Sequence, residues 1–356
     1  MTVQQLKNDI ERLANVPSVS GFEYRATESI REIYGKDFDE VLADAVGNHL
    51  LIKRCGRENA AKIMIDTHFD EIGLLVTDIV DGGFLRITNI GGIDPAIMQA
   101  ADVTVYGKEV LRGVIVSTPP HLRGEKSEEL EAINDLLVDI GQGYSKEELC
   151  ELVPIGTPIG FAPLYREFGE DFMAGKSFDD KACGAIAARA VIDTQKEDLA
   201  GDVYLCFSAR EEVANFGGAY NVCFATHPDY AMVIDVNLGA APDTPKRETV
   251  ELRGGISVDY SAATDRALTK ATEEICKEKE IPYSLCAAPS STGTNATAVN
   301  LTGKGIPVVD IGLPLRNMHT YNEVLCLEDC VSLARLVREF ICSDKIAEQF
   351  REEDII

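Results

Sequence analysis

Polar residues able to do acid–base or metal chemistry follow the apolar, strand-like segments of this 356-residue chain. They are His68 and Asp70 after Lys62–Thr67, Glu211 and Glu212 after Val203–Ala209, Asp235 near the end of Tyr230–Val236, and His319 after Ile306–Leu313. Groups at the carboxyl ends of parallel strands gather at one edge of a sheet. Zinc-class ions favour imidazole nitrogen and carboxylate oxygen. The sequence therefore predicts a metal or acid–base site at this edge.

The segment KSFDDKACG supplies a candidate bridge between two metal ions. Metal ions roughly 3.5–4 Å apart need a shared carboxylate between them. Asp179 fits this role because it lies in a loop just before a helix predicted to begin near Lys181, whose dipole favours a negative charge. Asp180 is the alternative bridge.

The same residues also have a structural interpretation. Adjacent glutamates usually lie on a solvated face, and a lone histidine after a strand is usually a hydrogen-bonded residue. Glu211 and Glu212, however, follow a wholly apolar strand, so one of them must face inward. His49 is interpreted as structural, His121 as bracing a turn or lining the cleft, and His227 as exposed in a loop. His68 and His319 are then the candidate ligands.

The elements that position these residues alternate between strand-like and helix-like segments, which predicts an α/β fold with a largely parallel sheet. The predicted helices have apolar residues at three- and four-residue spacing. They are Val3–Ala14, Glu23–Tyr34, Lys181–Thr194, Ala267–Lys279 and Leu327–Ile341.

One region interrupts the alternation. From Ile72 to Phe161 the chain has short strands separated by turn signals such as Asp81-Gly82-Gly83, a pattern typical of a small β-barrel or sandwich. The predicted organisation is a discontinuous α/β domain of residues 1–71 and 162–356, with a β-domain of residues 72–161 inserted into it.

Charge and cysteine content exclude several classes of function. The chain has 34 Lys and Arg against 59 Asp and Glu, for a net charge of −25. This charge argues against nucleic acid or an anionic membrane as partner. The N-terminal segment reads as a charged amphipathic helix, and no later segment has 18 uncharged apolar residues in a row. Ten scattered cysteines without CxxC are interpreted as reduced thiols, so a cytoplasmic location is expected.

Taken together, short motifs over nearly the whole chain resemble the M42 family of aminopeptidases, the glutamyl aminopeptidase and TET-peptidase group, some members of which are labelled endoglucanases. The motifs occur in the family's order: VSGFE, THFDEIG, GGIDP, PPHL, DIGQGYSKEEL, FDDK, REEV, IDV, TGTNA and IGLPLRNMHT. The resemblance implies a three-layer α/β/α metallopeptidase domain with a mixed, largely parallel sheet, plus an inserted β-barrel used for dimerisation or oligomerisation.

The resemblance also implies an activity and a role for each site residue. The activity is removal of the N-terminal residue of peptides by water activated on two divalent metal ions, with zinc expected first and cobalt or manganese as alternatives. The implied partners are peptides with a free N-terminus and further copies of the chain, in a dodecamer of dimers. The implied roles are metal ligation by His68, Asp179, Glu212, Asp235 and His319, metal bridging by Asp179 through a cis peptide to Asp180, general base catalysis by Glu211, and orientation of His68 by Asp70.

The chain departs from the family pattern at two points. Lys181-Ala182-Cys183-Gly184 follows the two aspartates, which predicts a modified turn there. Asn295 replaces the aspartate of TGTDA, and this segment is expected to border the substrate site or a neighbouring subunit.

Two other functions are less consistent with the sequence. A glycoside hydrolase with paired carboxylates has no need of the two histidines, and the chain has no Trp for a sugar platform. An inactive binding homologue would not require the intact ligand set. The preferred first residue of the substrate is not predicted.

Overall fold

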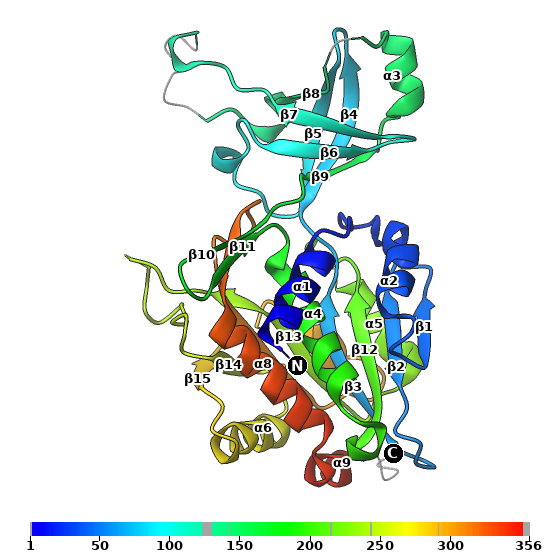
Figure 1. Ribbon diagram of the computed structural model, residues 1–356, viewed down its shortest axis with the longest axis vertical. Helices are drawn as coiled ribbons and strands as arrows, with labels where there is room; N and C mark the ends of the chain where they lie inside the picture. Colours follow the sequence, from blue (N-terminus) through cyan, green and yellow to red (C-terminus); the bar gives the residue numbers. More distant parts are fainter. Residues whose placement is uncertain are drawn as a thin grey trace.

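The computed structural model describes residues 2–122, 130–141, 143–213, 216–242, 244–290 and 292–351. It shows the predicted fold class, in which a mixed sheet between helices forms one part and a closed β-barrel forms the other (Figure 1). Among the described residues, no helix is both long enough and apolar enough to cross a lipid bilayer.

The main sheet has eleven strands, and its central strands are parallel. The order is β1-β2-β12-β3-β13-β16-β17-β11-β10, with β14 on β16 and β15 on β14. β12, β3, β13 and β16 run parallel, while β1, β2, β17, β11 and β10 pair antiparallel on either side. The bounds are β1 Glu40–Ala43, β2 His49–Lys53, β3 Ala61–His68, β10 Tyr165–Phe168, β11 Phe172–Gly175, β12 Gly201–Ser208, β13 Tyr230–Leu238, β14 Ile256–Tyr260, β15 Tyr283–Ala287, β16 Val308–Arg316 and β17 Glu323–Cys326.

Helices cover both faces of this sheet, because successive strand residues point to opposite sides. Ile63 and Ile65 of β3 belong to one buried cluster, whereas Met64 belongs to another. The first cluster includes side chains of α1, α2, α4, α6, α8 and α9, and the second includes side chains of α5 and α7. The bounds are α1 Val3–Ala14, α2 Thr27–Tyr34, α4 Phe178–Asp193, α5 Gly217–Thr226, α6 Arg266–Glu278, α7 Ala296–Asn300, α8 Leu327–Ile341 and α9 Asp344–Phe350.

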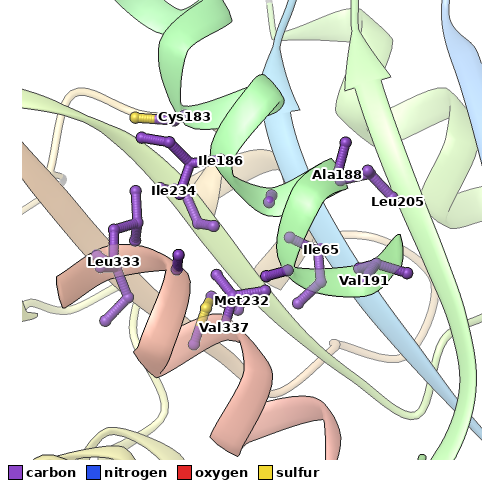
Figure 2. Packing of buried hydrophobic residues seen from close by; sticks show 14 of the residues in the cluster. Ile65, Cys183, Ile186, Ala188, Val191, Leu205, Met232, Ile234, Leu333 and Val337 are labelled. Atoms are coloured by element: carbon purple, nitrogen blue, oxygen red, sulfur yellow. The ribbon is translucent and has the colours of Figure 1, made fainter. Parts of the chain in front are cut away.

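Helix α4 lies at the centre of the first layer. It packs between the sheet and α8, with Ile186 and Val191 among side chains of the strands and α8 (Figure 2). Almost every residue of α4 is buried, which explains why it lacks a polar stripe. The prediction that a helix begins near Lys181 is confirmed for its continuous part: α4 is assigned from Phe178, but the backbone of Asp179 and Asp180 is not helical, so regular helical backbone starts at Lys181.

The barrel has its own apolar core. Its strands close in the order β4-β5-β8-β7-β6-β9, and buried residues such as Leu74, Leu85 and Val105 fill the interior. The bounds are β4 Gly73–Val80, β5 Phe84–Ile90, β6 Asp102–Tyr106, β7 Val110–Ile115, β8 Leu137–Asp139 and β9 Pro158–Phe161, with α3 Lys146–Leu152 alongside. The division of the chain into domains at residues 71 and 162 stays a prediction.

The barrel adjoins the carboxyl edge of the parallel strands. Only four residues separate the end of β3 at His68 from the start of β4 at Gly73. This short connection places the barrel directly above the edge at which the candidate site residues were predicted to gather (Figure 1).

Candidate active site

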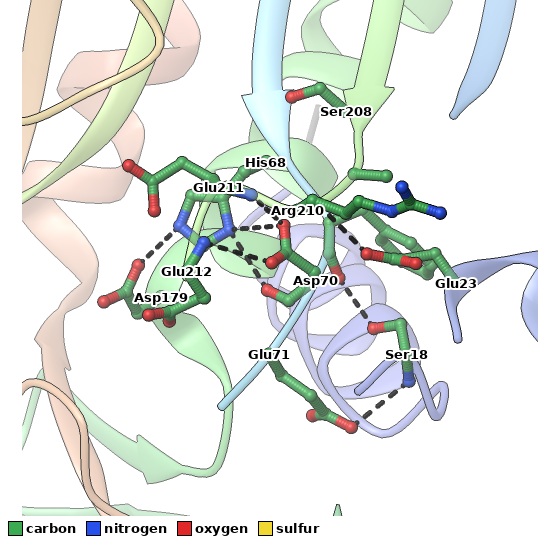
Figure 3. Close-up of polar contacts among 12 residues, drawn as sticks. Ser18, Glu23, His68, Asp70, Glu71, Asp179, Ser208, Arg210, Glu211 and Glu212 are labelled. Atoms are coloured by element: carbon green, nitrogen blue, oxygen red, sulfur yellow. Dashed lines mark hydrogen bonds and ion pairs between the residues drawn. The ribbon is translucent and has the colours of Figure 1, made fainter. Parts of the chain in front are cut away.

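The structure brings the predicted site residues together at the carboxyl edge of the sheet. His68 ends β3, Asp235 lies in β13, and Glu211 and Glu212 follow β12 after a short turn. Asp179 comes from the first turn of α4, and His319 from the loop between β16 and β17. Figure 3 shows His68 between Asp70 and Asp179, with the two glutamates beside it.

One group of potential metal ligands surrounds His68. Its Nε2 lies 2.8 Å from Oδ1 of Asp179 and 3.7 Å from Oδ1 of Asp235. All three residues are buried, and one ligand atom from each lies within 4.8 Å of the others. One imidazole and two carboxylates are a ligand set that zinc-class ions accept.

A second group surrounds His319. Its Nε2 lies 3.2 Å from Oε2 of Glu212 and 3.6 Å from Oδ2 of Asp179. Asp179 therefore belongs to both groups, with Oδ1 facing His68 and Oδ2 facing His319. Neither group contains Asp180, His49, His121 or His227.

Several carboxyl groups are buried close to one another at this edge, and their burial and mutual repulsion shift the pKa values of the site residues. Burial raises the pKa of Asp235 well above its usual range and also raises the pKa of Glu212. The hydrogen bond to Glu212 raises the pKa of His319 to about 9. Although burial opposes the shift, bonds to Asp179 and Asp70 raise the pKa of His68 well above its usual value. The carboxylates thus favour positive charge among them, which a protonated imidazole or a divalent cation supplies.

Glu211 differs from its neighbour Glu212. It belongs to neither ligand group. Burial raises its pKa to about 8, and the negative charges of Glu212 and Asp70 add to this effect. A carboxyl group with such a pKa can exchange a proton near neutral pH.

Asp70 connects the two sides of the site. The backbone oxygen of Asp70 lies 3.1 Å from Nδ1 of His68. The two carboxylate oxygens of Asp70 accept hydrogen bonds from the backbone N–H groups of Glu211 at 2.9 Å and Glu212 at 3.1 Å. If Nδ1 carries the proton of a neutral imidazole, the lone pair of Nε2 is directed toward Asp179 and Asp235. One side chain thus orients the turn that carries both glutamates.

The two aspartates of α4 point to different surroundings. The peptide bond between Asp179 and Asp180 is cis. The carboxylate of Asp179 faces both histidines, whereas that of Asp180 is fully buried and neither of its oxygens has a hydrogen-bond partner. Burial raises the pKa of Asp180 well above its usual range.

Three buried glutamates near the site were not among the predicted site residues: Glu23, Glu71 and Glu323. Glu71 accepts hydrogen bonds from Lys176, Ser177 and Lys181. This network accounts for the unusual Lys181, whose ammonium group is buried and also donates to the backbone oxygen of Val16 at 2.7 Å. A sequence signal existed for Glu71 and Glu23, since both lie in the motifs that carried the resemblance.

The expectation that the segment around Asn295 borders the substrate site or a neighbouring subunit stays a prediction, but the side chain of Asn295 itself is not exposed. Asn295 is buried at the start of α7, on the face of the sheet opposite α4. Its Nδ2 donates to Oδ2 of Asp66 and to Oγ of Ser208, each at 2.9 Å. An amide fits here because it can donate to Asp66, which a carboxylate cannot do.

The barrel forms a wall beside His319. A Cβ atom on Gly92 would lie 3.1 Å from Nδ1 of His319, so the missing side chain allows the barrel loop to approach the ring. Phe161 at the end of β9 also contacts Tyr321, with ring centroids 5.7 Å apart. The second ligand group is therefore bordered by both parts of the chain, while 39% of the His319 side chain stays exposed.

A mixed α/β sheet that carries two such groups of imidazole and carboxylate ligands at its carboxyl edge is an arrangement that metal-dependent hydrolases use. Comparison with known proteins identifies the particular family. The model of the M42 glutamyl aminopeptidase family matches residues 47–336, and the chain belongs to this family. It is a peptidase, as its named aminopeptidase relatives also indicate.

Individual relatives resemble the chain over nearly its full length. The lysyl aminopeptidase of Pyrococcus furiosus is 29% identical over 337 residues, which cover 93% of this chain and 95% of that protein. The structure of an aminopeptidase from Desulfurococcus kamchatkensis has a TM-score of 0.88 at 27% identity and covers 99% of both chains. The TET1 peptidase of Pyrococcus horikoshii, which assembles into a tetrahedron or a large octahedral shell, has a TM-score of 0.81 at 30% identity and covers 94% of this chain and 99% of its own.

The position of Asn295 leads to a stability prediction. Burial raises the pKa of Asp66 to about 6. A carboxyl whose pKa is raised on folding stabilises the folded protein while it is protonated. This stabilisation is lost as the pH rises through the pKa of the folded state. Asn295→Asp removes the donor and adds a second carboxyl, so we expect a loss of roughly 1–3 kcal/mol in the free energy of unfolding that is larger at pH 8 than at pH 5.

Urea denaturation at the two pH values measures this difference. The exposed Asn8→Asp is the matched control, since it makes the same charge change on the surface of α1. Equal stability of Asn295→Asp and Asn8→Asp at both pH values would contradict the placement of Asn295 against Asp66.

Proposed function

We propose that this protein is a dinuclear metal-dependent aminopeptidase that hydrolyses the N-terminal residue of peptides. The observation that carries the proposal is the position of Asp179, which offers one carboxylate oxygen to each of two ligand groups. A carboxylate shared in this way is what a pair of metal ions requires.

The residues that would hold the ions form two sets. His68, Asp179 and Asp235 would hold one ion, and Asp179, Glu212 and His319 the other. Because Asp180 faces neither histidine group, Asp179 is the better bridge. Two divalent ions, zinc first and cobalt or manganese as alternatives, would supply Lewis acidity and lower the pKa of water.

Glu211 is assigned as the general base. It belongs to neither ligand group, and the hydrogen bond from its backbone N–H to Asp70 fixes the turn that carries it beside both groups. Its carboxylate would accept the proton of the attacking water and return it to the leaving amine, which departs poorly without it. Asp70 acts through His68 and through this turn.

An activity assay tests the function. Amino-acid p-nitroanilides with a free α-amine should be hydrolysed, activity should disappear after chelation, and added zinc, cobalt or manganese should restore it. The N-acetylated forms of the same substrates are the control and should not be cleaved. Metal-independent hydrolysis, or equal hydrolysis of the acetylated substrates, would overturn the proposal. The panel would also identify the preferred first residue.

Glu211 and Glu212 should respond differently to the same substitution. Glu211→Gln keeps the shape but removes the basic oxygen, so two metal ions should remain bound while turnover falls by roughly 10²–10⁴. Glu212→Gln replaces an anionic ligand by a neutral amide, so one ion should be weakened and excess metal should partly restore activity.

Metal content by plasma emission spectroscopy, measured beside the peptidase rate, separates the two variants. Loss of metal from Glu211→Gln together with two retained ions in an inactive Glu212→Gln would show that the two roles are exchanged.

We further propose a cytoplasmic homo-oligomer of twelve subunits built from dimers, with the barrel of residues 72–161 as an inserted oligomerisation domain. The support is the similarity to the TET1 peptidase, which forms closed shells, and the presence of ten free cysteines, which suits a reducing compartment. Light scattering should give a mass near twelve times the 38.8 kDa of one chain, and a stable monomer at micromolar concentration would contradict the assembly.

A further inference from the structure

The first residue of β17, Glu323, binds both halves of the candidate metal site. Its Oε2 accepts the backbone N–H of Asp179 at 3.1 Å, and its Oε1 accepts the backbone N–H of His319 at 3.1 Å. The residue is buried, with 2% of its surface exposed. It belongs to neither ligand group, so it touches the backbone of the ligands and not the metal positions.

Regular backbone hydrogen bonding does not fix the conformation of the two segments that Glu323 contacts. Asp179 lies in the first turn of α4, where N–H groups have no partner within the helix, and its dihedral angles are not helical. His319 is a non-glycine residue with φ of 60°, in a loop where Asn317 also has a positive φ. Such conformations persist only where the surroundings determine them.

The sheet explains how one carboxylate reaches both segments. Gly175 of β11 pairs with Glu323 of β17 in the antiparallel ladder. Asp179 lies four residues after Gly175, and His319 lies four residues before Glu323. The two ligand segments therefore leave the same point of the sheet, and the side chain at that point lies between them.

We propose that Glu323 is a positioning residue that sets the spacing between the carboxylate of Asp179 and the imidazole of His319. This inference rests on the proposed function, since it concerns the same pair of metal ions. Because Asp179 would contribute to both ions, loosening Glu323 should weaken both of them. In this respect Glu323 differs from Glu212, whose loss should weaken only one.

Glu323→Gln is the direct test, because the amide has the same shape but offers one acceptor and one donor to two N–H groups. The matched control is Glu328→Gln, the same change on the exposed side of the first turn of α8. Metal-free forms of both variants and of the wild type would be titrated with Co²⁺, and the visible absorption spectrum would report ligand geometry at each step. Circular dichroism and light scattering would verify fold and assembly.

We expect Glu323→Gln to bind both Co²⁺ equivalents about 10–100-fold more weakly, with a changed spectrum, while Glu328→Gln matches the wild type. Unchanged affinities and spectrum in Glu323→Gln would overturn the inference, as would weakening of only one equivalent. If the wild type itself binds fewer than two ions, the proposed function fails and this inference fails with it.

A measurement on the wild type covers the case in which Glu323→Gln does not fold. Hydrogen–deuterium exchange should show slow exchange at the amides of Asp179 and His319, because each donates to the buried Glu323. Exchange of either amide at the rate of an unstructured chain would overturn the inference.

Discussion

The collection of negative charges at one buried edge of the sheet is the constraint on which the rest of this structure depends. Carboxylates removed from water repel one another and lose hydration, so each needs a donor or a cation. Asp179, Glu212 and Asp235 lie beside the two imidazoles. Asp70 and Glu323 instead accept backbone N–H groups of the segments that carry the ligands. The carboxylates of Asp70 and Glu323, which lie outside the two ligand groups, therefore position the segments that carry the ligands.

Next to this edge, lysine side chains surround a single carboxylate. Glu71 contacts both Lys176 and Lys181, so two buried lysines accompany one carboxylate, and burial lowers the pKa of Lys181 to about 7. Glu71 also lies in the four-residue connection between β3 and the barrel strand β4. The same network therefore joins the segment that carries Asp179 to the chain that enters the barrel. A barrel anchored in this way can keep Gly92 and Phe161 against the His319 loop, so the wall of the site and its ligands are positioned together.

The parts of this arrangement that could be predicted are those with a periodic or local signal. The pattern of parallel strands predicts the edge at which His68, Asp235 and the two glutamates meet. The short strands and turn signals of residues 72–161 predict the barrel. The irregular turn from Phe178 to Asp180 that precedes the regular part of α4 could not be predicted, because its backbone is non-helical in a way that only the packed site determines. The buried contact of Asn295 could not be predicted, because its partner, Asp66, is distant in the sequence. Glu323 carries no local signal, since its role depends on a ladder pair with Gly175.

The central claim is that Asp179 bridges two metal ions. Crystals of the protein loaded with zinc, measured on both sides of the zinc absorption edge, test it most directly. The account predicts two anomalous peaks about 3.5–4 Å apart, one beside His68 and Asp235 and one beside His319 and Glu212, with the carboxylate of Asp179 between them. A single peak, or two peaks bridged by a residue other than Asp179, would contradict it.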